Sequence, residues 1–183
     1  MTRLLMALVL APVMALAPLS ALAQDETAPE AYEAPMTLET LDAIIMALDP
    51  EAQTNGFAWQ MTIAEITVIV ITDEAADRMR AMAFIREAKD ITPEEMTRMM
   101  QANFDSALDA RYAIAQSKLW AAFIHPLSPL EKDEFISGLG QVVNLATSYG
   151  TLYSGGALQY GGGDSGEIQR KLIDELLEKG EEI

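Results

Sequence analysis

Three short runs, FAWQMTI at residues 57–63, ITVIVIT at 66–72 and RMRAMAFI at 78–85, decide how this chain folds. In the first run, apolar residues occupy every second position from Phe57 to Ile63, which is the period of a strand with one buried face. The second run is almost wholly β-branched, which is typical of a central strand covered on much of both faces. Because short turn-forming segments separate the runs, we predict an antiparallel meander.

A helix is predicted on the N-terminal side of the meander, over residues 38–48. Its apolar residues recur at helical spacing and therefore share one face. Thr37 is a suitable N-cap. Asp49-Pro50 ends the helix, because proline disfavours helical backbone in the residue before it.

Two more helices are predicted on the C-terminal side, each at a proline-containing capping box. The first begins at residues 92–95, with Pro93 in the first helical position, and runs to about Ala107. The second begins at residues 128–131, with Ser128 as the cap, and runs to about residue 154. An apolar stripe follows one face of the first of these helices and consists of Met96, Met99, Met100 and Phe104.

Two shorter strands, 111–116 and 119–124, are predicted between these helices. The long second helix contains Gly138 and Gly140, each of which weakens a helix by about 1 kcal/mol relative to alanine. We expect these glycines to permit close approach to the sheet or to a second chain.

The first 23 residues have the features of a secretory signal peptide. A short basic start leads into an apolar segment with two prolines, which ends in Ala21-Leu-Ala23. An uncleaved membrane anchor is the alternative, which the short apolar segment and its prolines disfavour. We therefore expect export to the periplasm, with no stable membrane insertion after cleavage. Residues 24–36 are polar and acidic and are predicted to form a disordered leader.

Beyond a folded domain at residues 37–154, we predict a Gly-rich linker at 155–166 and an amphipathic helix at 167–180. The apolar stripe of this helix consists of Ile168, Leu172, Ile173, Leu176 and Leu177. It is too apolar to stay exposed. Docking on its own domain or exchange within a dimer is the leading hypothesis, and docking on a partner is the alternative.

Composition excludes several classes of function. The net charge of −16 disfavours nucleic acid and anionic lipid as partners. No cysteine is present, so disulfides, thiol chemistry and iron–sulfur ligation are excluded. His125 is the only histidine, which rules out histidine-based metal clusters; a structural or solvent-facing role is expected, with a pH-sensitive imidazole as the alternative. We expect no metal and no cofactor.

Three other features are not interpreted as metal or phosphate sites. Asp73, Glu74 and Asp77 are interpreted as a solvated hairpin turn, because they lack the spacing and the glycine of a calcium loop. The methionines are assigned to the core or to an adaptable binding surface instead of a Cu(I) site. The Gly-rich segment at 153–165 is not a phosphate loop, because it lacks the Gly-Lys-Ser/Thr ending.

Four segments carry a resemblance to a known fold: residues 99–104, the strand pair 111–116 and 119–124, and residues 126–135 at the start of the last long helix. In these segments and in its α+β order, the chain resembles the type III secretion chaperone-like fold, shared by the secretion chaperones and the YbjN family. The resemblance implies a non-enzymatic protein that forms homodimers and binds segments of other proteins on its sheet and helix surfaces. The signal peptide departs from the cytoplasmic setting of secretion chaperones.

We therefore predict an α+β domain with a small antiparallel sheet of about five strands packed by helices. The predicted function is that of a non-catalytic, periplasmic, chaperone-like protein-binding module of the YbjN type, acting as a homodimer. An envelope hydrolase is the alternative, and it would need converging carboxylates in a concave pocket; a structural envelope component is the third class. Five residues are predicted to bind a partner: Trp59, Trp120, Tyr149, Leu172 and Leu176.

Overall fold

The computed structural model describes residues 34–105, 108–148 and 167–181. In chain order its elements are α1 (Leu38–Leu48), β1 (Gln53–Thr54), β2 (Ala58–Ile63), β3 (Ile66–Asp73), β4 (Arg78–Glu87), the 3-10 helix η1 (Ala88–Asp90), α2 (Pro93–Asp105), β5 (Arg111–Ala115), β6 (Lys118–His125), α3 (Lys132–Ser148) and α4 (Glu167–Glu181). The predicted signal peptide, the Gly-rich linker and Tyr149 lie outside the described residues. None of the helices in the described part of the chain is long and apolar enough to cross a bilayer.

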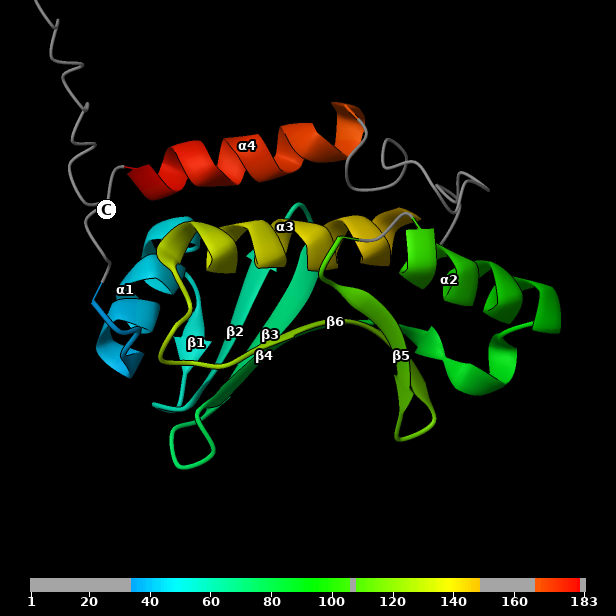
Figure 1. Ribbon diagram of the computed structural model, residues 1–183, viewed down its shortest axis with the longest axis horizontal. Helices are drawn as coiled ribbons and strands as arrows, with labels where there is room; N and C mark the ends of the chain where they lie inside the picture. Colours follow the sequence, from blue (N-terminus) through cyan, green and yellow to red (C-terminus); the bar gives the residue numbers. More distant parts are fainter. Residues whose placement is uncertain (1–33, 106–107, 149–166, 182–183) are drawn as a thin grey trace, which may run out of the picture. The chain divides into compact units, whose positions relative to one another are not determined.

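The strands form one antiparallel sheet of six strands in the order β1-β2-β3-β4-β6-β5. The helix α3 packs across one face of this sheet, and α4 lies on α3 (Figure 1). The predicted α+β class and the meander of β2, β3 and β4 are therefore confirmed. The sheet has one strand more than predicted, because β1 contains two residues and such a short strand shows no periodicity in the sequence.

Two details of the predicted meander are wrong. Phe57 lies outside β2 and is 55% exposed, because the Asn55 side chain accepts hydrogen bonds from the Phe57 and Ala58 backbone N–H groups and forms a turn there. The strand β3 is not covered on both faces: Val70 is fully buried, whereas Ile71 is 37% exposed. Its β-branched residues are therefore explained by strand preference, and only every second one is explained by burial.

The start of α2 is as predicted. The Thr92 N–H donates to Glu95 Oε2 over 2.9 Å, and the Glu95 N–H donates to Thr92 Oγ1 over 3.2 Å, which completes a capping box. Arg86 also donates to the second oxygen of Glu95. These bonds, that from Thr92 first, hold the pKa of the Glu95 carboxyl below its ordinary value.

The predicted start of α3 is wrong by three residues, because Ser128 is engaged elsewhere. Its N–H donates to Asp77 Oδ1 over 2.7 Å and its hydroxyl donates to Asp77 Oδ2 over 2.9 Å. The helix instead begins at Lys132, and the Glu134 side chain accepts a hydrogen bond from the Glu131 N–H at the new start. Asp77, predicted to lie in a solvated turn, thus joins the β3–β4 turn to the segment before α3.

These bonds predict an acid-sensitive contribution to stability. The Ser128 N–H, then its hydroxyl, hold the pKa of the Asp77 carboxyl below its ordinary value. A carboxyl with a lowered pKa in the folded state stabilises that state above the unfolded pKa, and the contribution is lost as pH falls through the folded pKa. We expect Asp77→Asn to be less stable than wild type at neutral pH, with the difference narrowing below about pH 4.

Urea unfolding midpoints measured from neutral pH to about pH 3 check this expectation. Glu74→Gln, in the same turn, removes a carboxylate that makes no hydrogen bond in the structure and serves as the matched control. Because the Glu95 contribution is common to all three proteins, it cancels in the differences. If the urea midpoints of wild type and Asp77→Asn differ by the same amount at every pH, the charge of Asp77 does not contribute to stability through its contact with Ser128.

The helix α3 is buried on most of its circumference because it lies between the sheet and α4. Its two glycines face opposite neighbours. A Cβ added to Gly138 would meet the Phe123 ring of β6, and a Cβ added to Gly140 would meet Ile173 of α4. Close approach to the sheet is therefore confirmed for Gly138, while Gly140 lies against the C-terminal helix of the same chain.

The C-terminal helix docks on its own domain. Ile173 is fully buried and Leu176 is 6% exposed, and the Lys132 ammonium donates to the Gly180 carbonyl over 3.0 Å. The helix predicted over residues 167–180 spans Glu167–Glu181, so Gly180 lies within α4, where it is buried against Ile136 of α3. A side chain at this position would collide with Ile136, which explains the glycine by packing.

Candidate functional site

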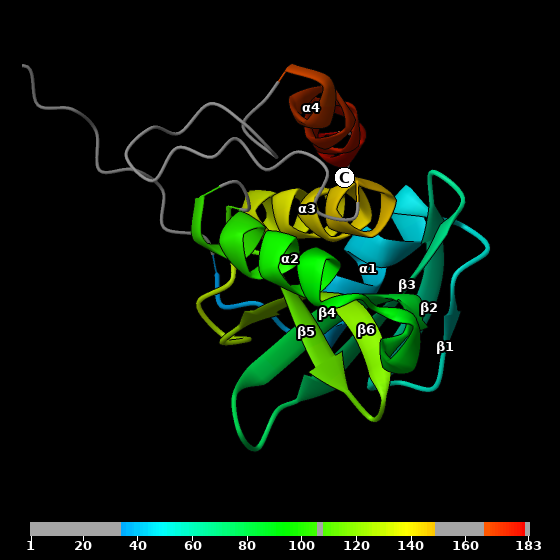
Figure 2. The same cartoon turned by 90° about the vertical axis from the view of Figure 1, so that its right-hand side faces the viewer.

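The face of the sheet opposite α3, here called the outer face, carries exposed apolar side chains. Figures 1 and 2 show α3 and α4 on the other side of the sheet. Residues paired across antiparallel strands point to the same face. The register therefore places on the outer face six large apolar residues, here called the outer patch: Ile69, Ile71, Met82, Phe84, Trp120 and Ile124.

Half of the outer patch is strongly exposed. Ile124 is 57%, Phe84 46% and Ile71 37% exposed, while the other three members are half-buried. The Phe84 and Trp120 rings meet edge to face with centroids 5.8 Å apart, and the Trp120 indole N–H donates to the Ala115 carbonyl over 3.2 Å. These contacts hold the two largest rings in fixed positions on the surface. A hollow of about 430 Å³ lies at one end of the patch, beside Ile71 and Ile124.

Three cations lie beside the outer patch and are here called the cationic rim: Arg78, Arg80 and Lys118. Arg80 lies directly between Ile71 and Ile124 in the paired strands. The Lys118 ammonium lies 5.6 Å from the centre of the Phe84 ring. No rim residue belongs to the ion pairs of the described residues, which involve Arg86 and two cations of α4. Positive charge is thus concentrated at an apolar surface of an acidic protein.

A second exposed apolar cluster lies at the β5 edge of the sheet. The two-residue turn before β6 makes Ala115 and Lys118 a hydrogen-bonded pair, so the backbones of Tyr112 and Ile114 face the free edge. The Asn103 side chain of α2 bonds both backbone groups of Tyr112, over 3.1 Å and 2.8 Å. The backbone N–H and C=O of Ile114 have no strand partner, and its side chain is 48% exposed.

Two residues of α2 extend this cluster. Met100 is 48% and Phe104 is 74% exposed, whereas Met99 is fully buried. The predicted apolar stripe is therefore only partly a core stripe, because α2 lies at the sheet edge and contacts little beyond β5. Met100, Phe104 and Ile114 are here called the edge cluster.

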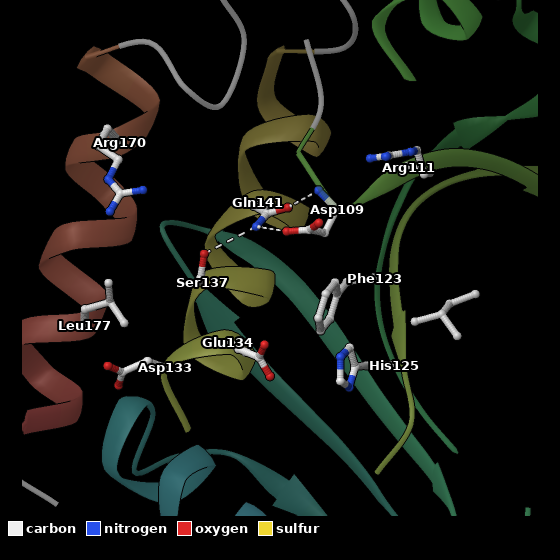
Figure 3. A pocket seen from close by; sticks show the side chains of 11 residues that line it. Asp109, Arg111, Phe123, His125, Asp133, Glu134, Ser137, Gln141, Arg170 and Leu177 are labelled. Atoms are coloured by element: carbon white, nitrogen blue, oxygen red, sulfur yellow. Dashed lines mark hydrogen bonds between the residues drawn. The ribbon is translucent and has the colours of Figure 1, made fainter. Parts of the chain in front are cut away.

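A hollow with a volume of about 570 Å³ lies between β6, α3 and α4. Its three carboxylates, Asp109, Asp133 and Glu134, are all exposed. Figure 3 shows Gln141 at one wall, bonded to Asp109 and to Ser137. Gln141 also accepts the Asp109 and Ala110 backbone N–H groups and so fixes the chain that enters β5.

His125 lines the same hollow. Its Nδ1 lies 2.8 Å from the Pro126 carbonyl oxygen, and its ring stacks on Phe123 with centroids 5.9 Å apart. The described residues contain no group of three His, Asp or Glu side chains arranged to hold a metal ion. The imidazole packs against the Phe123 ring at the end of β6.

The structure describes four of the five predicted partner-binding residues, all except Tyr149. Trp59 is 2% exposed, and its indole N–H donates to Asp42 of α1 over 2.7 Å, so it presents no surface. Leu176 is buried and Leu172 half-buried in the contact of α4 with its own domain. Trp120 alone lies on the outer patch. Phe84 and Ile124 were missed, because the apolar sequences of β4 and β6 do not show which face of each strand the helices cover.

No family model and no curated protein matches this sequence. Two solved structures are similar in fold. The crystal structure of the ExsC-ExsE complex is 12% identical, over 52% of this chain and 75% of its own, with a TM-score of 0.41. The structure of the HopA1-SchA chaperone-effector complex is 11% identical, over 61% of this chain and 93% of its own, with a TM-score of 0.45. At these identities no residue role transfers from either structure.

Proposed function

We propose that this protein is a non-catalytic, chaperone-like module that holds an extended segment of another protein on the outer face of its sheet. The observation that carries the proposal is the outer patch, an apolar surface built on paired strands and left uncovered by the described helices. Contiguous exposed apolar surface of this kind marks sites of protein interaction. Its rings are fixed in place, which lowers the entropic cost of binding.

We also propose that the protein acts in the periplasm and is of the YbjN type. The signal-peptide features of residues 1–23 support the location. The order of helices and strands supports the type. Cell fractionation, with detection of a form that begins near Gln24, tests the location independently of binding.

A loss of peptide binding on changing the outer patch is the expected test result. The probe is a set of short labelled peptides in which apolar and charged residues alternate, followed by fluorescence anisotropy. Truncating a residue at the hot spot of an interface costs about 2 kcal/mol or more, and Ile124 is the most exposed member of the outer patch. We therefore expect Ile124→Glu to weaken binding by roughly 30-fold, since each 1.4 kcal/mol is tenfold.

Met46→Glu is the matched control, because Met46 is a 36% exposed apolar residue on α1, away from the outer patch. Thermal unfolding of both variants shows that each is folded. Equal weakening by the two variants, or binding unaffected by Ile124→Glu, would place the binding surface elsewhere.

We propose that two copies associate through the edge cluster. The supporting features are the unpaired Ile114 backbone and the exposed side chains of Met100 and Phe104, which together offer strand pairing and apolar contact. We expect Phe104→Glu to raise the dimer dissociation constant at least about tenfold, because the buried charge has no partner. Sedimentation velocity over a concentration series measures this change.

Ile124→Glu serves as the control in the sedimentation experiment, because it alters the outer patch and leaves the edge cluster intact. A wild-type protein that sediments as a monomer at every concentration would remove the dimer proposal. Peptide binding would be unaffected by that outcome.

A further inference from the structure

We propose that the segment held on the outer patch is acidic as well as apolar, with carboxylates that pair with the cationic rim. This inference rests on the proposed function and adds the chemistry of the partner. It goes against the composition of the chain, since a protein with 28 acidic and 12 basic residues should repel acidic partners.

The local charge of the outer face is opposite to the net charge. The register places on this face the three cations of the rim and two acidic residues, Asp73 and Glu87. In the strand register, Asp73 lies opposite Arg78 and Glu87 lies opposite Lys118, in each case at the end of a strand. Arg80 has no acidic neighbour directly opposite in the sheet.

Distance decides which charge a bound segment meets. The Debye length is about 8 Å at physiological ionic strength, so most of the acidic residues on other faces are screened from a ligand on the outer patch. The rim cations instead lie beside the apolar side chains: Lys118 is 5.6 Å from the Phe84 ring, and Arg80 lies between Ile71 and Ile124. A segment that contacts the patch therefore places its flanking charges next to cations.

An acidic polypeptide fits this surface better than an anionic bilayer does. A bilayer would also meet the turn between β3 and β4, which projects from the sheet in Figure 1 and carries Glu74 and Asp77. A narrow extended segment reaches the patch without covering that turn. The alternation of rim and patch residues along β4, with Arg80 and Met82 two positions apart on one face, matches a chain with alternating charged and apolar groups.

The test compares two labelled peptides of identical apolar sequence, one with glutamate and one with lysine at the charged positions. We expect the glutamate peptide to bind the mature protein about tenfold more tightly at ~0.05 M salt and within about threefold at ~0.5 M. The double variant Arg78→Glu, Arg80→Glu should remove the preference. Lys171→Glu, an exposed cation of α4 with an i,i+4 acidic partner, is the control and should keep it.

The outcomes separate this inference from the proposed function. Equal binding of both peptides, or tighter binding of the lysine peptide, overturns the acidic partner while leaving the outer patch as the binding surface. Binding of neither peptide overturns both.

Binding of anionic vesicles that the rim variant abolishes, with no binding of the glutamate peptide, would assign the face to a membrane. A dimer lost in the rim variant would assign it to a second copy, and tighter peptide binding on deletion of residues 24–35 would assign it to the chain's own acidic segment.

Discussion

Replacing Gly138 by alanine is expected to destabilise the protein, although alanine favours a helix over glycine by ~1 kcal/mol. The added Cβ would lie 2.6 Å from Phe123 Cδ1 and 2.9 Å from Phe123 Cγ. The Phe123 ring is 5% exposed, stacks on His125 and lines the hollow between β6, α3 and α4, so turning away from α3 would disrupt its stacking on His125. Overpacking of this kind costs ~1–3 kcal/mol, and we expect a net loss of about 1–2 kcal/mol in the free energy of unfolding.

A second substitution tests the cause of this loss. Phe123→Ala removes the ring atoms Cγ, Cδ1 and Cε1 that the new methyl group meets, so the double variant Gly138→Ala, Phe123→Ala should be more stable than the sum of the single changes predicts. Urea unfolding followed by circular dichroism supplies the four free energies. If Gly138→Ala is as stable as wild type or more stable, the helix preference of alanine outweighs the collision. In that case β6 shifts to make room for the added methyl group on α3.

Local signals in the sequence predict much of the fold. The bounds of α1 follow from Thr37 as N-cap and from Asp49-Pro50, and the capping box at Thr92 and Glu95 forms as predicted. Such signals are reliable because the hydrogen bonds that they predict join residues three or four positions apart. Alternating apolar residues likewise predict the inner face of β2 and its antiparallel partner.

Sequence-based predictions fail where a contact with a distant residue overrides a local preference. Ser128 has the sequence of a helix cap, but Asp77 binds it from 51 positions away and moves the helix start to Lys132. The apolar stripe of α2 predicts a buried face, but α2 lies at the sheet edge, so Phe104 is exposed. Neither arrangement is visible in the sequence, because each depends on the order of strands in the sheet.

The candidate site shows the same division. Aromatic residues are the best single-sequence candidates for binding, yet Trp59 is in the core and Trp120 is on the outer patch. Both lie in predicted strands rich in apolar residues, and periodicity alone cannot tell which face of a strand the helices cover. The strand register resolves this, because it aligns Trp120 with Phe84 and Trp59 with buried Val70.

Replacing Ile173 by aspartate is expected to release α4 from the domain. Ile173 is fully buried, with its Cγ1 placed 2.8 Å from the position of a Cβ on Gly140. Burying an unpaired carboxylate costs more free energy than the docking of one helix contributes. The helix should therefore undock instead of burying the charge. Two buried and two half-buried apolar side chains suggest a docking free energy of roughly 2–4 kcal/mol after the entropy of ordering is subtracted.

Undocking of α4 sets an upper limit on the stability that Ile173→Asp can remove. Once α4 has undocked, the substitution has no further effect, so Ile173→Asp should unfold at the same urea concentration as a chain that lacks residues 164–183. Lys171→Glu, exposed on the same helix, should leave stability within about 0.5 kcal/mol of wild type. If the truncated chain is as stable as wild type and keeps its oligomeric state, α4 does not stabilise the domain by docking. If Ile173→Asp is far less stable than the truncated chain, α4 does not undock as a unit, and its packing on α3 is part of the cooperative core.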